Sequence, residues 1–116
     1  MLKATFEEAN GKISLTIEGH ADQAEYGKDI VCSACSILTY TVAQIVADAM
    51  HRGMLISQPH IELESGIGII SCEPVENAYN HLKQAFIFAE VGFILLSKEY
   101  PQNVDLIMFG TADYLS

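Results

Sequence analysis

The amino-acid sequence predicts an α+β domain: a mostly antiparallel sheet of about five strands, in the order ββαββαβ, with two helices packed on one face. Two observations lead to this prediction. Short segments of alternating apolar and polar residues occur in pairs joined by turn residues, and two long segments have the apolar spacing of helices. No repeat or linker divides the 116 residues, so we expect residues 1–116 to form a single domain.

The first hairpin is predicted from alternation on both sides of a tight turn. Residues 2–7 and 13–18 alternate apolar and polar side chains, as half-buried strands do. Asn10-Gly11 lies between them, and this dipeptide is typical of a two-residue hairpin turn. The first two strands should therefore pair directly with one another.

A second hairpin and a final strand are predicted later in the chain. Residues 60–64 alternate in the same way, Ser65-Gly66 provides a turn, and residues 68–72 form an apolar, β-branched run. Residues 104–109 resemble a last short strand before a polar tail. The helices must therefore lie between the two hairpins and before this last strand.

Two segments have helical periodicity. In residues 31–51 the polar side chains fall near one narrow stripe, so we expect most of this helix to be buried, with Gly53 as its stop signal. In residues 75–98 one apolar stripe should face the core, and further apolar residues lie elsewhere around the helix. The core stripe consists of Leu82, Phe86, Ala89, Phe93 and Leu96, and the other residues are Ile87, Phe88, Val91 and Ile94. This surplus predicts a homodimer.

Composition limits the partners. The chain has 6 basic and 15 acidic residues, a net charge of −9 that repels nucleic acids and anionic membranes and attracts cationic partners, although it also simply favours solubility. Residues 85–96, an apolar window that contains Glu90, are shorter than the roughly twenty residues that span a bilayer, so we expect no membrane anchor. An odd set of three cysteines, without a signal peptide, favours the reducing cytoplasm.

His20 and Cys32 stand at the two ends of one connection and are the main candidate catalytic residues. A cysteine in the first turn of a helix faces unpaired N–H groups and the positive end of the helix dipole, which favour the thiolate. A histidine beside it would complete an activated nucleophile. The connection, residues 21–30, is long and includes Ala21, Gly27 and Lys28, so we expect a mobile loop that orders over a bound peptide.

Three residues near Cys32 are predicted to support it. Asp29 is placed to be the N-cap of the helix, accepting a hydrogen bond from the N–H of Cys32. The N–H groups of Cys32 and Ser33 would then face a developing oxyanion. Ser36 lies one turn further along the same face, where it would bond near the sulfur or back to the carbonyl of residue 32.

Other interpretations of the cysteines are open at this point. Cys32 by itself could be a small apolar side chain buried in the core. Cys32-x-x-Cys35 resembles a redox dithiol, although no βαβ unit accompanies it. Cys35 fits the core better. A metal site from His20, Cys32, Cys35 and Cys72 lacks a second ligand pair with the usual spacing, so no metal or other cofactor is expected. His51, His60 and His81 are interpreted as surface residues.

These residues resemble the ribosomal-processing cysteine protease family Prp, also called YsxB-like. The matching segments are Gly19-His20-Ala21, the run from Gly27 to Ala34, and Ser36. The resemblance implies a dimeric, cytoplasmic thiol protease that removes a short N-terminal extension from a large-subunit ribosomal protein, cutting after an aromatic residue.

Within this resemblance, the nucleophile corresponds to Cys32 and the histidine to His20, while Asp29 and Ser36 support the site. Cys35 occupies a variable position, and whether it forms an inactivating disulfide is left open. The alternatives are a noncatalytic ribosome-assembly interaction module, which needs no reactive thiol, and a thiol redox protein that uses Cys32 and Cys35.

Overall fold

The computed structural model describes residues 1–19 and 28–110, and for Lys28 and Asp29 it describes the backbone alone. The predicted catalytic His20 and the loop residues Ala21 and Gly27 lie outside the described residues. The elements are β1 (Leu2–Ala9), β2 (Lys12–Glu18), α1 (Lys28–His51), β3 (His60–Glu64), β4 (Ile67–Cys72), a short 3₁₀ helix η1 (Glu76–Ala78), α2 (Tyr79–Glu99) and β5 (Val104–Ile107). The predicted order ββαββαβ is confirmed.

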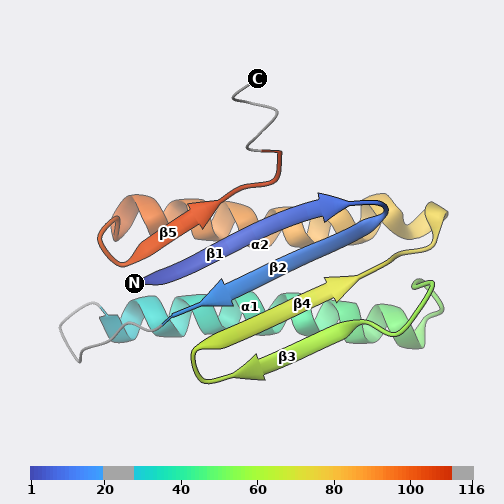
Figure 1. The fold of residues 1–116 in the computed structure, drawn as a ribbon, viewed down its shortest axis with the longest axis horizontal. Helices are drawn as coiled ribbons and strands as arrows, with labels where there is room; N and C mark the ends of the chain where they lie inside the picture. Colours follow the sequence, from blue (N-terminus) through green and yellow to red (C-terminus); the bar gives the residue numbers. More distant parts are fainter. Residues whose placement is uncertain (20–27, 111–116) are drawn as a thin grey trace.

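The five strands form one sheet in the order β3-β4-β2-β1-β5 (Figure 1). The pairs β3–β4, β4–β2 and β2–β1 are antiparallel, and β5 runs parallel to β1, with Leu2 opposite Val104. The sheet is therefore mostly antiparallel, as predicted, and the parallel pairing of β5 makes it a mixed sheet. The reason is that α2 carries the chain back to the end of the sheet where β1 begins, so β5 starts beside the start of β1.

Both predicted hairpin turns are present. Asn10 and Gly11 have φ values of 54° and 81°, the left-handed conformations of a tight hairpin turn, and they join Ala9 to Lys12 in direct register. Gly66, with φ of 85°, turns the chain between β3 and β4. Local turn chemistry therefore sets the register of both hairpins.

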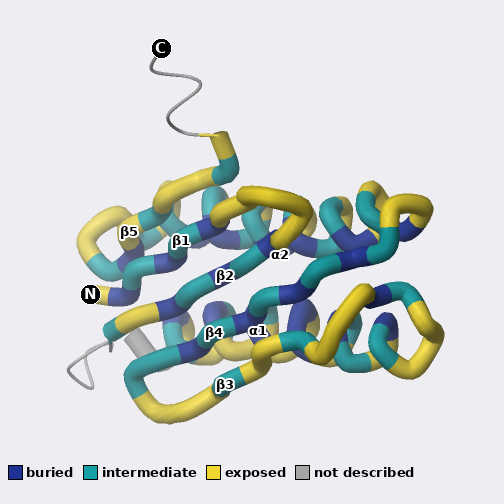
Figure 2. The backbone as a smooth tube through the Cα atoms, turned by 45° about the vertical axis from the view of Figure 1, so that its right-hand side comes forward, coloured by how far each residue is buried: buried dark blue, intermediate teal, exposed yellow. Residues whose placement is uncertain are grey.

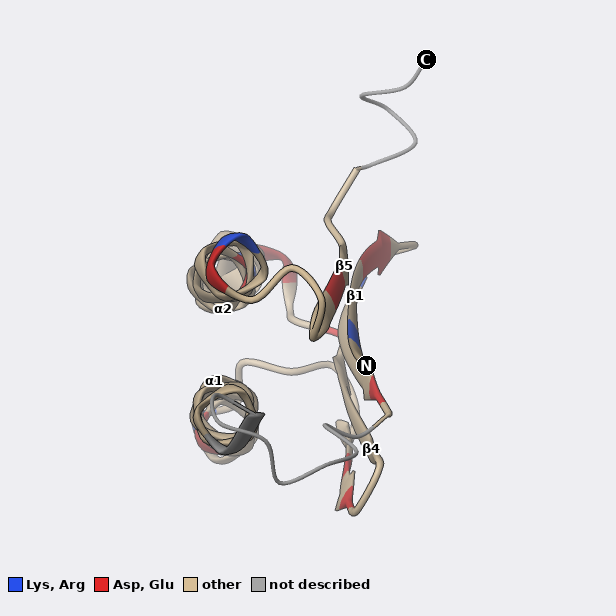
Figure 3. Ribbon diagram, turned by 90° about the vertical axis from the view of Figure 1, so that its left-hand side faces the viewer, with Lys and Arg blue, Asp and Glu red and all other residues tan. Residues whose placement is uncertain are grey.

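The two helices cover the same face of the sheet, as predicted (Figure 3). Their inner sides and the inward residues of the strands form one core, in which Phe6 of β1 meets Phe93 of α2 edge-on at 5.9 Å between ring centroids. The predicted core stripe of α2 is confirmed, since all five of its members are buried: Leu82, Phe86, Ala89, Phe93 and Leu96. This core packs α1 and its cysteines against the sheet at β4.

Helix α1 differs from the prediction at its start and on its outer face. It begins at Lys28, three residues earlier than expected, and ends before Gly53, whose φ is 70°. Buried and exposed residues alternate along α1 (Figure 2). The exposed ones include large apolar side chains, with Ile37 64% and Tyr40 55% accessible. The expectation that most of this helix is buried is therefore wrong for the single chain.

The apolar character of α1 extends along almost its whole length. Residues Ile30–His51 are long and apolar enough to cross a membrane, as judged by length and composition alone, a test that core helices of folded domains also pass. This segment is longer than the apolar window of residues 85–96 and was not predicted from the sequence. In the fold, the inner side of α1 packs against the sheet.

The last strand ends earlier than predicted. β5 stops at Ile107, because the N–H of Phe109 donates a hydrogen bond to the Glu90 carboxylate of α2 at 2.7 Å and so directs the chain away from β1. The Phe109 ring lies under the Lys83 ammonium, 3.9 Å from the ring centroid. Lys83 also donates to Glu8 at 2.7 Å, which ties α2 to the end of β1.

Candidate active site

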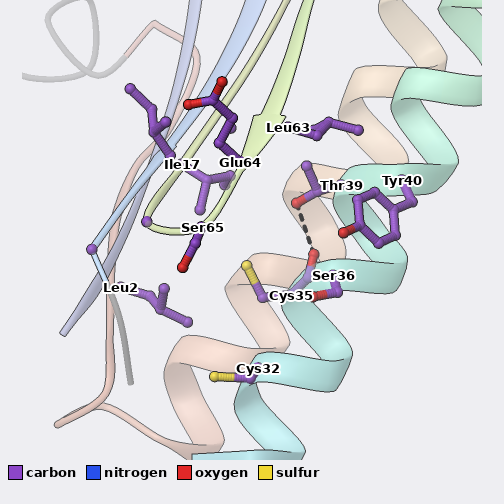
Figure 4. A pocket seen from close by; sticks show the side chains of 14 residues that line it. Leu2, Ile17, Cys32, Cys35, Ser36, Thr39, Tyr40, Leu63, Glu64 and Ser65 are labelled. Carbon is purple, nitrogen blue, oxygen red and sulfur yellow. Dashed lines mark hydrogen bonds between the residues drawn. The ribbon is translucent and has the colours of Figure 1, made fainter. Parts of the chain in front are cut away.

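A cavity of about 340 Å³ lies between the first turns of α1 and the sheet (Figure 4). Its wall on the helix side comes from α1, and its other walls come from the start of β1, the end of β2 and the turn between β3 and β4. The side chains labelled in the figure are Leu2, Ile17, Cys32, Cys35, Ser36, Thr39, Tyr40, Leu63, Glu64 and Ser65. The cavity has a size that suits one large side chain of a ligand.

Cys32 and Ser36 share this cavity, as the helical spacing predicts. Cys32 is half-buried, and its sulfur lies on the side of α1 that faces Leu2 and Ser65 (Figure 4). Ser36 follows one turn later and is exposed. An accessible thiol and a hydroxyl therefore line the same hollow.

Cys35 is buried, which confirms its predicted place in the core, but it also lines the cavity beside Cys32. Burial raises the pKa of the Cys35 thiol, the Thr39 hydroxyl partly opposes this, and the neighbouring Cys32 raises it further. Thr39 also donates a hydrogen bond to the Cys35 carbonyl at 2.7 Å. Cys35 is therefore held as a protonated thiol at neutral pH.

Gly19 connects the cavity to the segment that carries His20. It is the last described residue before that segment, it lines the cavity, and its N–H donates to the Gly66 carbonyl at 3.0 Å. Its φ is 95°, and a Cβ atom at this position would clash with the main-chain carbonyl of Met1. The chain therefore leaves β2 at the cavity that Cys32 lines, although His20 itself lies outside the described residues.

Ser33, a predicted supporting residue, does not line this cavity, and Asp29 does not have its predicted N-cap position. Ser33 lies beside a separate shallow hollow with Ile30, Ala34 and Ile37 on the exposed side of α1. Asp29 is part of the first turn of α1, so it is not the N-cap residue before the helix, and its side chain is outside the described part of the chain. The changed position of Asp29 follows from the earlier start of the helix.

The early start also changes the electrostatic argument for Cys32. Cys32 comes four residues after Lys28, the first residue of α1. The helical hydrogen-bond pattern therefore pairs the N–H of Cys32 with the carbonyl of Lys28, so this N–H is not one of the unpaired groups at the helix end. The dipole effect is concentrated in the first turn and is weaker here. The prediction that the N–H groups of Cys32 and Ser33 face an oxyanion therefore does not follow from this helix.

The remaining titratable candidates lie elsewhere. His51, His60 and His81 are exposed, which confirms their interpretation as surface residues. Cys72 is buried in β4, outside the cavity lining, and burial raises its pKa to about 11. Within residues 1–19 and 28–110, no group of three or more histidine, cysteine, aspartate or glutamate side chains could hold a metal ion.

Several residues that form the walls of the cavity were not predicted from the sequence. Gly68 approaches α1 closely, since a Cβ atom on it would lie 3.6 Å from a methyl group of Thr39. Thr39 and Tyr40 follow Ser36 by one turn of α1, and this spacing is the only sequence signal for them. The contribution of the turn between β3 and β4 has no such signal, because it depends on the strand order.

An accessible cysteine in a cavity is an arrangement that nucleophilic catalysis can use. The chain belongs to the family of the cysteine protease Prp, whose family model matches residues 1–105. It is thus a member of a cysteine protease family. A search of curated proteins found no significant match.

Solved structures share the fold. SMU.848 from Streptococcus mutans is 25% identical, with a TM-score of 0.64 over 94% of this chain and 95% of that one. The ribosomal processing protease Prp from S. aureus, with a covalently linked product peptide, is 25% identical, with a TM-score of 0.61 over 94% and 99% of the two chains. The same protease with a substrate peptide is 24% identical and has the same TM-score and coverage.

Proposed function

We propose that this chain is a cysteine endopeptidase that removes a short N-terminal extension from a large-subunit ribosomal protein. The observation that carries the proposal is the accessible Cys32 thiol in a cavity, in a chain that belongs to the Prp family. The S. aureus relative is a ribosomal processing protease that has been captured with a covalently linked product peptide. A cavity of about 340 Å³ would hold one aromatic side chain of such a peptide.

The proposed mechanism uses a Cys–His dyad. His20 takes the proton from Cys32, and the thiolate attacks the scissile carbonyl carbon to form a tetrahedral intermediate. The protonated His20 then gives its proton to the leaving amine, and water hydrolyses the thioester. Asp29 and Ser36 support this dyad, and the segment with Ala21 and Gly27 covers the bound peptide. Lys28, predicted as part of this loop, is instead the first residue of α1. Ser36 lines the same cavity as Cys32, which favours its part in this arrangement.

Charge favours a basic substrate. The enzyme has a net charge of −9, and Glu64 adds a carboxylate to the cavity wall. A strongly anionic surface attracts a cationic ribosomal protein over a distance of several ångströms and raises the rate of encounter. The same field disfavours direct binding of nucleic acid, which we do not include among the partners.

We further propose that the enzyme is a cytoplasmic homodimer. All three cysteines are free thiols, which suits a reducing compartment. The outer sides of the two helices expose large apolar residues, among which Phe88 is 75% and Leu95 62% accessible. Sedimentation should show a dimer that Phe88→Glu dissociates, while Ile56→Glu, at an exposed residue outside the helices that is 62% accessible, leaves it intact. Cell fractionation should recover the protein without detergent.

The deciding experiment is cleavage of peptides that carry the N-terminal extensions of ribosomal proteins from the same organism, followed by mass spectrometry. Cys32→Ala and His20→Ala should each abolish cleavage while the fold survives. Cys72→Ala removes a cysteine outside the cavity and serves as the matched control. Cleavage by Cys32→Ala at the wild-type rate would show that another group is the nucleophile.

Binding and disulfide-reduction measurements beside the cleavage assay separate the protease from the two alternative functions. Binding of the basic protein without cleavage would favour a noncatalytic ribosome-assembly module. Reduction of a disulfide substrate that needs both Cys32 and Cys35, without peptide cleavage, would favour a thiol redox protein.

A further inference from the structure

Two thiols, Cys32 and Cys35, line one cavity, and the proposed mechanism uses only the first. We propose that Cys35 is a resolving thiol: after a hydroperoxide oxidises Cys32, Cys35 closes a reversible Cys32–Cys35 disulfide. That this disulfide switches peptidase activity off and on rests on the proposed function. The formation of the disulfide depends only on the two sulfur atoms and their surroundings.

The helix brings the two residues within bonding reach. Residues three apart in an α-helix have Cα atoms about 5 Å apart, inside the range of about 4.4–6.8 Å that disulfides span. Both sulfur atoms lie on the side of α1 that faces Leu2 and Ser65 (Figure 4). No other residue has to move out of the way along the helix surface, because Ser33 and Ala34 between them face the other side.

The bond would be a strained one and therefore easily reduced. Cβ atoms three residues apart on a helix are about 5–6 Å apart, whereas a disulfide needs about 4 Å. The adjustment falls on the second turn of α1, between Cys32, which is open to the cavity, and Cys35, which is buried. Strained disulfides have less negative reduction potentials and are the ones that cells reverse readily.

Burial assigns different parts to the two thiols. Cys32 is half-buried and open to the cavity, so a hydroperoxide reaches it first. Cys35 is buried, and the desolvation that raises its pKa keeps it as a thiol that peroxide oxidises slowly. Cys72 is also buried and lies outside the cavity, so it does not compete for the oxidised sulfur.

The chemistry balances in two steps. The Cys32 thiolate attacks one oxygen of the hydroperoxide, the O–O bond breaks, and the products are a Cys32 sulfenic acid and water or an alcohol. The Cys35 sulfur then attacks the Cys32 sulfur, so that an S–S bond forms, the S–O bond breaks, and water leaves with the Cys35 proton. Two electrons pass from the two thiols to the hydroperoxide, and a dithiol reductant returns them.

Mass spectrometry tests the proposal directly. Trypsin cuts after Lys28, Arg52 and Lys83, so Cys32 and Cys35 fall in one peptide, residues 29–52, and Cys72 falls in another. After brief treatment with hydrogen peroxide and blocking of free thiols, the 29–52 peptide should be two hydrogen atoms lighter and unblocked. Dithiothreitol should restore both thiols. The proposal would be overturned by a 29–52 peptide in which Cys32 carries added oxygen and Cys35 carries the blocking group, because Cys35 would then have remained a free thiol.

Variants sharpen the test. In Cys35→Ser the sulfenic acid has no partner, so Cys32 should proceed to the sulfinic acid, which dithiothreitol does not reverse. Cys72→Ala, the matched control, should form the disulfide as the wild type does. Disulfide formation in Cys35→Ser between Cys32 and Cys72 would also contradict the proposal, because it would show that the cavity does not select the partner.

Activity is measured separately, each variant against its own untreated sample. The wild type should lose at least about tenfold in cleavage rate after peroxide and recover with dithiothreitol, and Cys35→Ser should not recover. A protein that forms the disulfide but cleaves no peptide would contradict the proposed function and support the thiol pair. A peptidase that peroxide inactivates without forming the disulfide would support the function and refute the pair.

Discussion

Gly19 and Met1 meet main chain to main chain, so closely that a side chain on Gly19 would clash with the Met1 carbonyl. At the same point the N–H of Gly19 donates to the carbonyl of Gly66, at 3.0 Å. The end of β2 is therefore clamped between the start of β1 and the turn of the second hairpin. This clamp sets where the chain departs toward His20, at the rim of the cavity that contains Cys32.

Gly19→Ala should therefore damage both stability and catalysis. The φ of 95° already costs an L residue about 1–2 kcal/mol, and the clash with fixed backbone adds to this. We expect a loss of about 2–4 kcal/mol in the free energy of unfolding, together with a fall in peptide cleavage. Urea denaturation and a cleavage assay under folding conditions measure the two effects.

Gly11→Ala is the matched control for this prediction. Gly11 has a similar φ of 81°, but no atom lies within 4 Å of a Cβ atom built there. The Gly11→Ala variant should lose only the conformational contribution to its free energy of unfolding, about 1–2 kcal/mol, and keep its cleavage activity. Equal losses of stability for the two variants would show that the contact with Met1 carries no energy.

Gly68 tests whether the cavity binds the substrate. A Cβ atom at Gly68 would make ordinary contacts of 3.6 Å with Ile17, Leu63 and Thr39, so Gly68→Ala should fold and cleave normally. Gly68→Leu should fill part of the cavity, cost about 1–3 kcal/mol of stability, and raise KM for the peptide about tenfold or more. Steady-state kinetics on the folded variants give KM and kcat separately. An unchanged KM in folded Gly68→Leu would show that the peptide binds elsewhere.

The three cysteines should react with iodoacetamide at different rates. The thiolate is the reactive form, and burial raises the pKa of Cys35 and raises that of Cys72 to about 11. At pH 8 the folded protein should therefore be labelled first at Cys32, and labelling of Cys72 should accelerate as the pH rises toward 11. Timed labelling with peptide mass spectrometry measures the order.

In urea the same three thiols should react at nearly equal rates, because unfolding removes the burial that distinguishes them. If Cys72 were labelled as fast as Cys32 in the folded protein, the cavity would not be the accessible thiol site, and equally fast labelling of Cys35 would show that burial does not protect its thiol. This outcome is independent of any peptidase assay.

Glu8 should make stability depend on acid pH. Hydrogen bonds from Lys83 and Tyr79 hold the pKa of Glu8 below its ordinary value of 4.5. A carboxylate with a lowered pKa in the folded state stabilises above its unfolded pKa, and this contribution disappears as the pH falls through the folded value. Glu8→Gln should therefore be less stable than the wild type at neutral pH, and the difference should shrink below pH 4.5.

Urea denaturation at a series of pH values gives this difference. Glu7→Gln is the control, because it removes an exposed carboxylate from the adjacent position, on the opposite face of β1. A constant gap between Glu8→Gln and the wild type from neutral to acid pH would mean that the charge of Glu8 does not stabilise the fold.

Much of the fold could be predicted because the information is local. Asn10-Gly11 specifies a tight turn by its own conformational preferences, and the 3.6-residue spacing of Leu82, Phe86 and Phe93 specifies which side of α2 faces the core. Where competing contacts come from distant parts of the chain, the prediction failed. β5 ends at Ile107 because Glu90 of α2 captures the N–H of Phe109.

The candidate site also has some features that local sequence predicts and others that depend on distant contacts. Cys32, and its helical neighbour Ser36 on the same face, could be recognised from spacing and from the segments that resemble the protease family, because both kinds of information lie within one stretch of chain. The apolar surplus of the helices also predicted exposed faces such as that of Phe88. These features depend only on which residue types occur in the sequence and on their helical spacing.

Only the tertiary structure decided that Cys35 shares the cavity of Cys32, that Gly19 must lack a side chain, and that the turn at Gly66 forms part of the wall. Each of these depends on which strands lie side by side and on how closely α1 packs over them. Those distances result from packing the whole core, whose contacts join residues far apart in the chain, and no local pattern encodes them.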